Sequence, residues 1–402
     1  MAFDPEALKA AMESARRKSE LGDNTTDQVL PAEQVREQAV KPDVDLTTNY
    51  MGLELPAPLV ASAGPLSQHV EDIQAMADAG VGAVVLFSLF EEQVKLEQAR
   101  ATAEMEVHAE SFAEALSYFP TEPSNESGLV HNYLKLIQRA SSAIDVPLIA
   151  SLNTPISGDS SDISKRMVDA GASAIELNVY FVPGSVRDPR EVEDAQLRIL
   201  ESVKNQVDVP VAMKMMPYFS SFGHLAKRLS AAGADGLVLF NRWLGPDVEL
   251  DRLEYHPGFE LSTPNEGKLP RAWISALRGE VDCSLAGSGG VETSDDVVKY
   301  ILSGADVVMT TAALVRHGVA YASQLIEGLG RWLEVRRVDL DTARGMLLSP
   351  HGEEADAYAR AGYVSGLEQA KRVYGRYFFP FKNPVGKGVP DRVLPFFAER
   401  LS

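Results

Sequence analysis

The chain has 402 residues, a formal net charge of −19 and a single cysteine, Cys283. One cysteine excludes a disulfide framework, a zinc cluster or an iron–sulfur centre built from this chain alone. The acidic charge disfavours general binding to nucleic acid and to anionic membranes. The low cysteine content and the lack of a transmembrane-length apolar run predict a cytoplasmic protein without a membrane partner.

The order of residue types along the chain predicts three parts. Residues 1–45 are polar and indicate an N-terminal arm, in which residues 5–21 can form a short amphipathic helix. Residues 46–345 carry a regular pattern that indicates the main domain. Residues 346–402 form an aromatic-rich C-terminal extension, and such density predicts docking onto the main domain or onto a neighbouring subunit. We therefore expect a homo-oligomer.

Short apolar runs alternate with segments of helical period in the main domain, which indicates repeated βα units and an α/β fold with a parallel sheet. The eight apolar runs are 59–63, 83–87, 148–152, 174–179, 211–215, 236–240, 284–287 and 306–309. Eight units predict a (β/α)8 TIM barrel, whose functional side chains lie at the carboxyl ends of the strands. A doubly wound open sheet is the alternative, but it would place a glycine-rich phosphate loop after its first strand.

Two connections of the predicted barrel are longer than usual. They cover residues 88–128 and 241–270, and both follow strands at the face where barrel enzymes act. We expect them to serve as lids or substrate loops.

Small residues follow the last two apolar runs. The sequence Gly-Ser-Gly-Gly occupies residues 287–290, and Thr-Thr-Ala occupies residues 310–312. In a β/α barrel, backbone N–H groups at these two strand ends can hold a phosphate group. The pair of loops therefore predicts a phosphorylated ligand.

Neutral amides and one ammonium group follow the other expected strands. Asn153, Asn178 and Asn241 offer both donors and acceptors, which suits a planar heterocycle with alternating C=O and N–H groups. Lys214 lies in an apolar run, where its charge is costly unless it meets an anion. A structural ion pair is the alternative to a ligand. Cys283 is expected to be a small buried core residue, and no metal-ligand cluster or Ser-His-Asp arrangement is recognisable.

Five segments, in this order, resemble the dihydroorotate dehydrogenase family. They are LELPAPLVASAGP (53–65), AIELNVY (174–180), VPVAMKMMPYFSS (209–221), GADGLVLFNR (233–242) and GSGGVETSDDVVKYILSGADVVMTTAAL (287–314). The resemblance extends over residues 46–345 and points to the divergent branch called dihydroorotate dehydrogenase-like. Members are FMN-dependent (β/α)8 barrels of pyrimidine biosynthesis. The resemblance therefore implies FMN and hydride transfer between a small, dihydroorotate-like CH–CH substrate and this cofactor.

The resemblance also implies roles for single residues. The implied FMN-binding residues are Ser62, Ala63, Gly64, Ser151, Asn178, Lys214, Gly289, Gly290, Thr311 and Ala312. Asn178 and Asn241 would bind the substrate, and Asn153 is an alternative to Ser151 beside the ring. Lys214 would stabilise the negative charge that grows on the flavin as it is reduced.

Several family residues are replaced in this chain. Phe181 stands where soluble members carry their catalytic cysteine, and a phenyl ring cannot accept a proton. Pro183 replaces the second asparagine of the same run, and residues 86–88 replace a lysine-serine-serine segment. We expect that the flavin site is kept while much of the dihydroorotate site is not.

Two mechanisms remain open. In the first, Tyr180, Ser88 or another residue of the 88–128 connection transfers the proton, and Lys214, Tyr180 and Asn178 form the candidate catalytic set. Tyr180 can equally be a packing aromatic. In the second, the protein is a non-catalytic or electron-transfer component of a larger complex, with a partner protein that exchanges electrons with FMN. A sugar-phosphate barrel without flavin is a third interpretation.

Overall fold

The computed structural model describes residues 44–96, 99, 128–158, 160–180, 187–243, 245–258 and 260–378. The chain divides into two compact units, of which one is residues 39–348, here called the barrel unit. The other combines residues 1–38 with 349–402. The expected helix at residues 5–21 lies outside the described residues, as do most of the 88–128 connection and the chain beyond residue 378.

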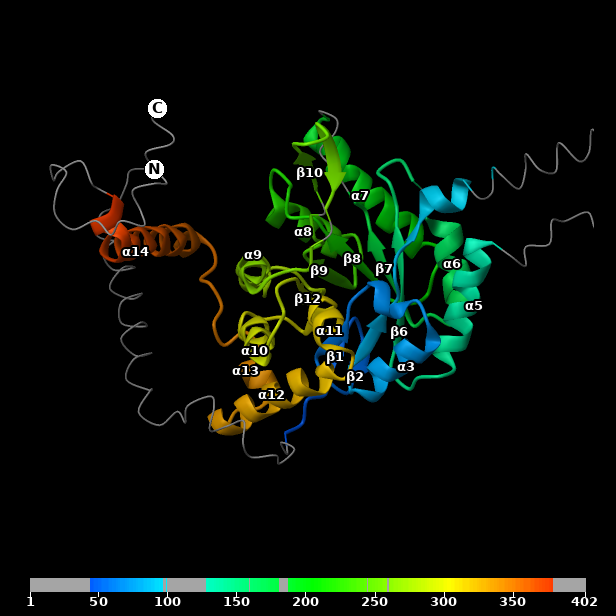
Figure 1. Cartoon of the computed structure of the whole chain (residues 1–402), viewed down its shortest axis with the longest axis horizontal. Helices are drawn as coiled ribbons and strands as arrows, with labels where there is room; N and C mark the ends of the chain where they lie inside the picture. Colours follow the sequence, from blue (N-terminus) through cyan, green and yellow to red (C-terminus); the bar gives the residue numbers. More distant parts are fainter. Residues whose placement is uncertain are drawn as a thin grey trace, which may run out of the picture. The chain divides into compact units, whose positions relative to one another are not determined.

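Eight parallel strands form a closed barrel (Figure 1). They are β3 (Leu59–Ala61), β4 (Ala83–Val85), β6 (Leu148–Asn153), β7 (Ala174–Asn178), β8 (Val211–Met215), β9 (Gly236–Leu239), β12 (Ser284–Ser288) and β13 (Val307–Thr310). The first strand pairs with the last, since β3 lies between β13 and β4, and β4 also pairs with β6. The predicted (β/α)8 barrel is confirmed, each predicted apolar run overlaps one strand, and the open-sheet alternative is excluded.

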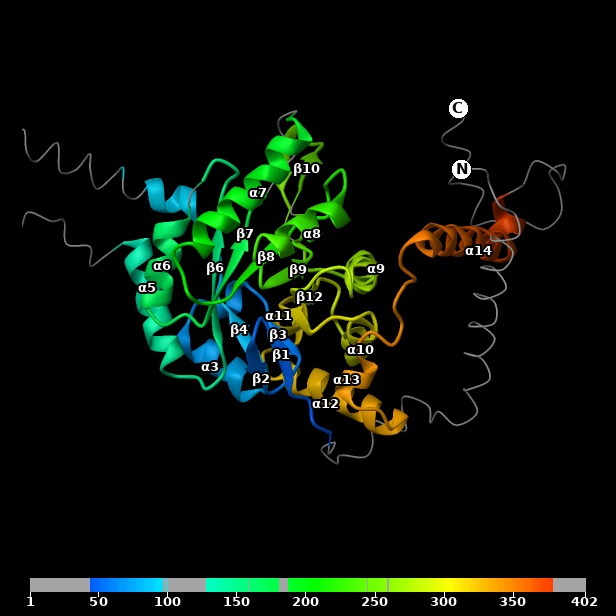
Figure 2. The ribbon, with the colours of Figure 1, turned by 180° about the vertical axis from the view of Figure 1, so that it is seen from behind.

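Helices surround the barrel, as both views show (Figures 1 and 2). They are α3 (Val70–Asp78), α5 (Leu129–Ser141), α6 (Ser161–Asp169), α7 (Pro189–Lys204), α8 (Phe222–Ala231), α9 (Lys268–Leu277), α10 (Ser294–Leu302), α11 (Ala312–His317), α12 (Tyr321–Arg336) and α13 (Leu340–Ala343). Their buried apolar faces pack on the strands in one large core.

The start of α10 is fixed by a capping box between Thr293 and Asp296. Although burial opposes ionisation, hydrogen bonds from the Thr293 backbone and from Lys299 hold the pKa of Asp296 below its usual value. This helix follows the predicted phosphate loop directly, so its cap also fixes the loop.

The amino-terminal end of the barrel is closed by a hairpin that the sequence analysis missed. Strands β1 (Thr48–Tyr50) and β2 (Leu53–Leu55) pair antiparallel and insert Tyr50 and Met51 into the barrel interior. The barrel strands leave room for these side chains by carrying small inward residues there, namely Ala83, Ala174, Ala212, Gly236 and Ala286. A Cβ on Gly236 would lie 3.0 Å from Cγ of Met51, so a larger residue here would require the Met51 side chain to shift.

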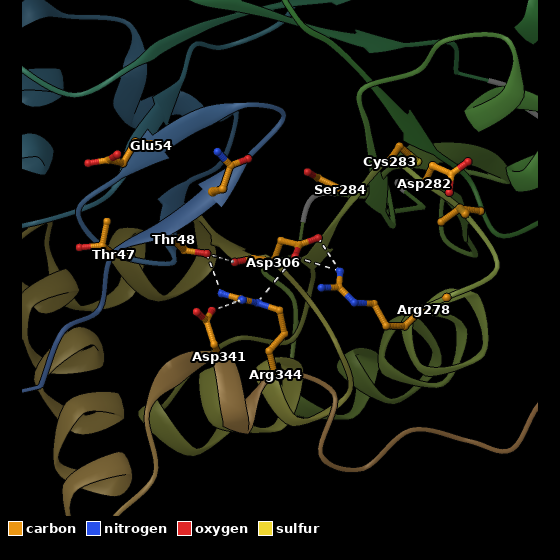
Figure 3. Close-up of a pocket in the computed structure, with 13 residues that line it drawn as sticks. Thr47, Thr48, Glu54, Arg278, Asp282, Cys283, Ser284, Asp306, Asp341 and Arg344 are labelled. Carbon is orange, nitrogen blue, oxygen red and sulfur yellow. Dashed lines mark hydrogen bonds and ion pairs between the residues drawn. The ribbon is translucent and has the colours of Figure 1, made fainter.

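A polar pocket of about 680 Å³ lies beside this hairpin (Figure 3). Arg278 and Arg344 converge on Asp306: Arg278 donates to both carboxylate oxygens at 2.8 and 2.9 Å, and Arg344 also donates to Thr48 at 2.7 Å. Cys283 lines the same pocket; it is half-buried rather than fully buried as expected, and burial raises the pKa of its thiol. Arg344 also pairs with Asp341, so two arginines meet two carboxylates in this network. The network lies at the end opposite to barrel active sites, and we interpret it as a tether for the hairpin.

The 241–270 connection contains regular structure. Strands β10 (Pro246–Glu249) and β11 (Glu254–Pro257) form a separate hairpin, followed by the 3-10 helix η4 (Pro264–Gly267). Leu250, Leu253 and Tyr255 are exposed on this hairpin. It therefore offers an apolar surface near the carboxyl ends of the strands.

Helix α14 (Glu353–Phe378) belongs to the second unit. Tyr358, Tyr363 and Tyr374 are exposed along it, so the aromatic character of the extension begins within this helix. The docking expected of the extension stays a prediction. None of the helices among the described residues is both long and apolar enough to cross a bilayer.

Candidate active site

A cavity opens at the carboxyl ends of β3, β8, β9, β12 and β13. Eight of the predicted site residues line it: Ser62, Ala63, Gly64, Lys214, Asn241, Gly289, Thr311 and Ala312. Phe240, Leu261, Val291 and Met309 add apolar walls. Residues far apart in the sequence thus meet at one mouth, because parallel strands place all their carboxyl ends on the same side of the barrel.

The loop after β12 needs glycine at two positions for different reasons. Gly289 and Gly290 have φ angles of +92° and +67°, where other residues are strained. A Cβ on Gly289 would meet nothing within 4 Å, so this backbone faces open space. A Cβ on Gly290 would lie 2.4 Å from the backbone nitrogen of Gly267. Gly290 therefore packs against η4, and its N–H donates to Ser262 at 3.3 Å rather than pointing freely into the cavity.

Tyr300 of α10 anchors the same loop from behind. Its hydroxyl donates to the carbonyl oxygens of Ser288 at 3.1 Å and of Gly289 at 2.7 Å. Burial raises the pKa of Tyr300, so the phenol stays protonated and can donate. The ring also occupies the space that a side chain at Gly287 would need, since a Cβ there would lie 2.2 Å from Cδ1 of the ring. The loop is consequently held in one conformation.

The first and last barrel strands are joined at the cavity. The Thr311 hydroxyl donates to the Ser62 carbonyl at 2.8 Å, and the Ser62 N–H donates to the Thr310 carbonyl at 3.0 Å. A Cβ on Gly64 would lie 2.5 Å from Cγ2 of Thr311, so the chain approaches too closely for a larger residue. The Ser62–Gly64 segment therefore forms a fixed wall of the cavity.

Lys214 is positioned both to meet a ligand and to form a structural ion pair, the two roles that the sequence left open. It lines the cavity, and its Nζ also forms a buried ion pair with Glu176 at an N–O distance of 3.1 Å. A weaker contact of 3.4 Å reaches the Ser62 hydroxyl. Glu176 was not predicted as a site residue. Alternation along β7 is the signal that could have found it, because Ala174, Glu176 and Asn178 occupy every second position of that strand.

The two amides predicted to bind substrate lie together. Asn241 donates from Nδ2 to Oδ1 of Asn178 at 2.9 Å, and Asn241 also donates its backbone N–H to the Met215 carbonyl at 2.7 Å. Ser151 is fully buried on β6, where its hydroxyl contacts that of Ser88 at 2.8 Å. Asn153 is buried at the end of β6, in register with Asn178. Asn178 and Asn241 thus form a hydrogen-bonded pair, of which Asn241 lines the cavity, and Asn153 lies beside Asn178 on the neighbouring strand.

Tyr180 lies two residues beyond β7 and is half-buried. Phe181 and Pro183, which replace family residues, lie outside the described residues. The proton-transfer role predicted for Tyr180 stays a prediction.

These features define a (β/α)8 barrel protein whose cavity, at the carboxyl ends of the strands, combines a buried cation, amides and an open glycine loop. The family model described as dihydroorotate dehydrogenase matches residues 45–333. The chain belongs to the dihydroorotate dehydrogenase family.

Curated relatives carry the name of dihydroorotate dehydrogenase B (NAD(+)), catalytic subunit. The protein from Listeria monocytogenes is 30% identical over 171 residues, which are 41% of this chain and 56% of that protein. The protein from Methanothermobacter thermautotrophicus is 26% identical over 292 residues, which are 71% of this chain and 92% of that protein. The protein from Halalkalibacterium halodurans is 30% identical over 183 residues, 42% of this chain and 58% of that protein. The chain thus spans a little over half the length of the Listeria relative it matches.

Proposed function

We propose that this protein is an FMN-dependent oxidoreductase that transfers hydride between a small, dihydroorotate-like substrate and FMN. The observation that carries the proposal is the single cavity that contains both Lys214 and the open backbone at Gly289. A ligand with an anionic tail and a ring that gains negative charge would meet complementary groups at both ends. Family membership supports the same assignment.

The residues present fit FMN. The absence of any atom within 4 Å of a Cβ at Gly289 leaves room for a phosphate at that backbone, beside Thr311 and Ala312. The Gly290 N–H is satisfied by Ser262, so we propose that Gly290 shapes the cradle and that Gly289 faces the phosphate. When bound, FMN supplies a two-electron acceptor. Ser62, Ala63 and Gly64 form the fixed wall for its ring, and Ser151 lies on β6, which is separated from β3 by β4.

The ammonium group of Lys214 is a fixed cation that lines the cavity. A positive charge that is preorganised in a site shielded from water stabilises developing negative charge without reorganisation. Asn178 and Asn241 present amide donors and acceptors to a planar substrate ring. With Phe181 at the position of the family cysteine, we propose Tyr180 as the group that moves the substrate proton.

A visible spectrum and one mixing experiment test this function. We expect the purified protein, after addition of FMN and removal of the excess by gel filtration, to retain a flavin spectrum. Anaerobic mixing with dihydroorotate should then bleach the flavin band. Retained flavin without bleaching would assign a different substrate to the same cofactor site, whereas a colourless protein would refute the proposal and favour the flavin-free barrel.

An electron-transfer component of a larger complex is the second candidate. The exposed Leu250, Leu253 and Tyr255 on the β10–β11 hairpin favour it, because they offer apolar contacts to a partner protein on the connection that follows β9. Affinity purification from the native host tests this alternative. A stoichiometric partner that reduces the flavin supports it, and a homo-oligomer that turns over substrate alone contradicts it.

A further inference from the structure

Glu176 is a buried carboxylate in the barrel interior with one charged partner. Its side chain is 1% exposed and that of Lys214 is 8% exposed, so both charges are shielded from water. One carboxylate oxygen, Oε1, accepts from Lys214, whereas Oε2 has no hydrogen-bond partner among the described residues. A buried carboxylate with only one oxygen hydrogen-bonded lowers the stability of the fold. The presence of a glutamate at this position therefore requires an explanation.

The two buried phenols that interact electrostatically with Glu176 carry no compensating charge. Burial, together with the negative charge of Glu176, raises the pKa of Tyr50 well above its usual value. Burial also raises the pKa of Tyr133. Both phenols consequently stay neutral. Among the described residues, Lys214 is the cation in direct contact with this carboxylate.

We propose that Glu176 is a positioning residue that sets the net charge which the cavity presents to the cofactor. It holds Nζ of Lys214 between its own Oε1 and the Ser62 hydroxyl, at the cavity wall. It also cancels part of the positive charge that Lys214 presents to the cavity. The inference rests on the proposed FMN function, because its consequence is the ease with which the bound flavin is reduced.

The sign of the effect follows from charge alone. Reduction adds negative charge to the flavin, which Lys214 stabilises and Glu176 opposes. Glu176→Gln keeps the shape and an oxygen that can accept from Lys214, but it removes the opposing charge. We expect the ratio of reduced to oxidised flavin, at a fixed redox potential of the solution, to rise about tenfold. This corresponds to a midpoint potential about 30 mV higher for a two-electron couple.

The test measures midpoint potentials by equilibration with reference dyes under argon, at saturating FMN. The matched control is Glu193→Gln, since Glu193 is also a buried glutamate with a cationic partner, Arg228 at 3.4 Å, but it lies outside the barrel on α7. We expect Glu176→Gln to raise the potential and Glu193→Gln to leave it unchanged. Equal potentials for Glu176→Gln and the wild type would overturn the inference.

The double variant Glu176→Gln with Lys214→Met covers the case in which Glu176→Gln does not fold, because it leaves neither a buried ammonium nor a buried carboxylate unpaired. The pair that it removes carries little net charge, so its potential should stay within about 30 mV of the wild type, which is a tenfold change in the ratio of reduced to oxidised flavin. A larger fall would mean that the lysine charge was not cancelled and would overturn the inference. A wild type that binds no FMN refutes the proposed function instead, so the two failures are distinguishable.

Discussion

Replacing Gly290 by alanine should destabilise the folded protein without any ligand present. The new Cβ would lie 2.4 Å from the Gly267 nitrogen and 2.8 Å from the Thr263 carbonyl oxygen, and both are backbone atoms that cannot rotate away. The positive φ of Gly290 adds strain of about 1–2 kcal/mol for an L residue. Overpacking adds about 1–3 kcal/mol. We therefore expect a loss of about 2–5 kcal/mol in the free energy of unfolding, measured by urea denaturation of the flavin-free protein.

Gly289→Ala is the matched comparison. Its Cβ would meet nothing within 4 Å, so only the backbone strain of about 1–2 kcal/mol applies. The added methyl group enters the open space assigned to the phosphate, and FMN affinity should fall at least about tenfold, which is 1.4 kcal/mol. Flavin fluorescence titration measures this loss. Equal stability of Gly290→Ala and the wild type, or unchanged FMN affinity of Gly289→Ala, would refute the packing argument.

Three further predictions concern neighbouring groups. Asp296→Asn should cost about 1 kcal/mol at neutral pH, as loss of a helix cap does. Because the pKa of Asp296 is lowered in the folded state, its contribution to the free energy of unfolding is present above about pH 4 and is lost as the pH falls through the folded pKa. Urea denaturation from pH 7 to pH 2 should therefore show the unfolding free energies of the wild type and the variant converging in acid. Tyr300→Phe removes the hydroxyl that holds two loop carbonyls; it should lower stability by about 1–3 kcal/mol and weaken FMN binding, and a titration showing full affinity would contradict this. Asn241→Ala should weaken orotate binding to the FMN-loaded protein about tenfold while FMN affinity stays constant, as calorimetry can check, and an equal loss of both would place Asn241 on the cofactor instead.

The barrel could be predicted because its strands are buried on both faces and appear as continuous apolar runs. The clustering of Ser62, Lys214, Asn241 and Gly289 could be predicted for a related reason, since a barrel gathers its carboxyl strand ends at one mouth. Both inferences need only local sequence and a known architecture.

The β1–β2 hairpin was missed because its signal is not local. Tyr50 fits inside the barrel because five strands that are distant in the sequence carry small inward residues, and no short window of sequence contains that relation. The tether among Arg278, Asp306 and Arg344 depends in the same way on three separate elements.

Glu176 shows why the contacts of a single charged residue are hard to predict from the sequence. The sequence placed it two residues before Asn178 on a buried strand, but its partner, Lys214, comes from the neighbouring strand. Strand register decides which inward side chains meet, and register is a property of the assembled barrel. The different roles of Gly289 and Gly290 likewise could not be predicted from the sequence, because they depend on how closely η4 approaches the loop.

The central claim is that the cavity holds FMN with its phosphate at the glycine loop. Parallel fluorescence titrations of the flavin-free protein with FMN and with riboflavin, which lacks the phosphate, test it most directly. We expect saturable one-to-one binding of FMN, and binding of riboflavin that is weaker by at least about tenfold, or 1.4 kcal/mol. Equal affinity for the two flavins, or no binding of either, would contradict it.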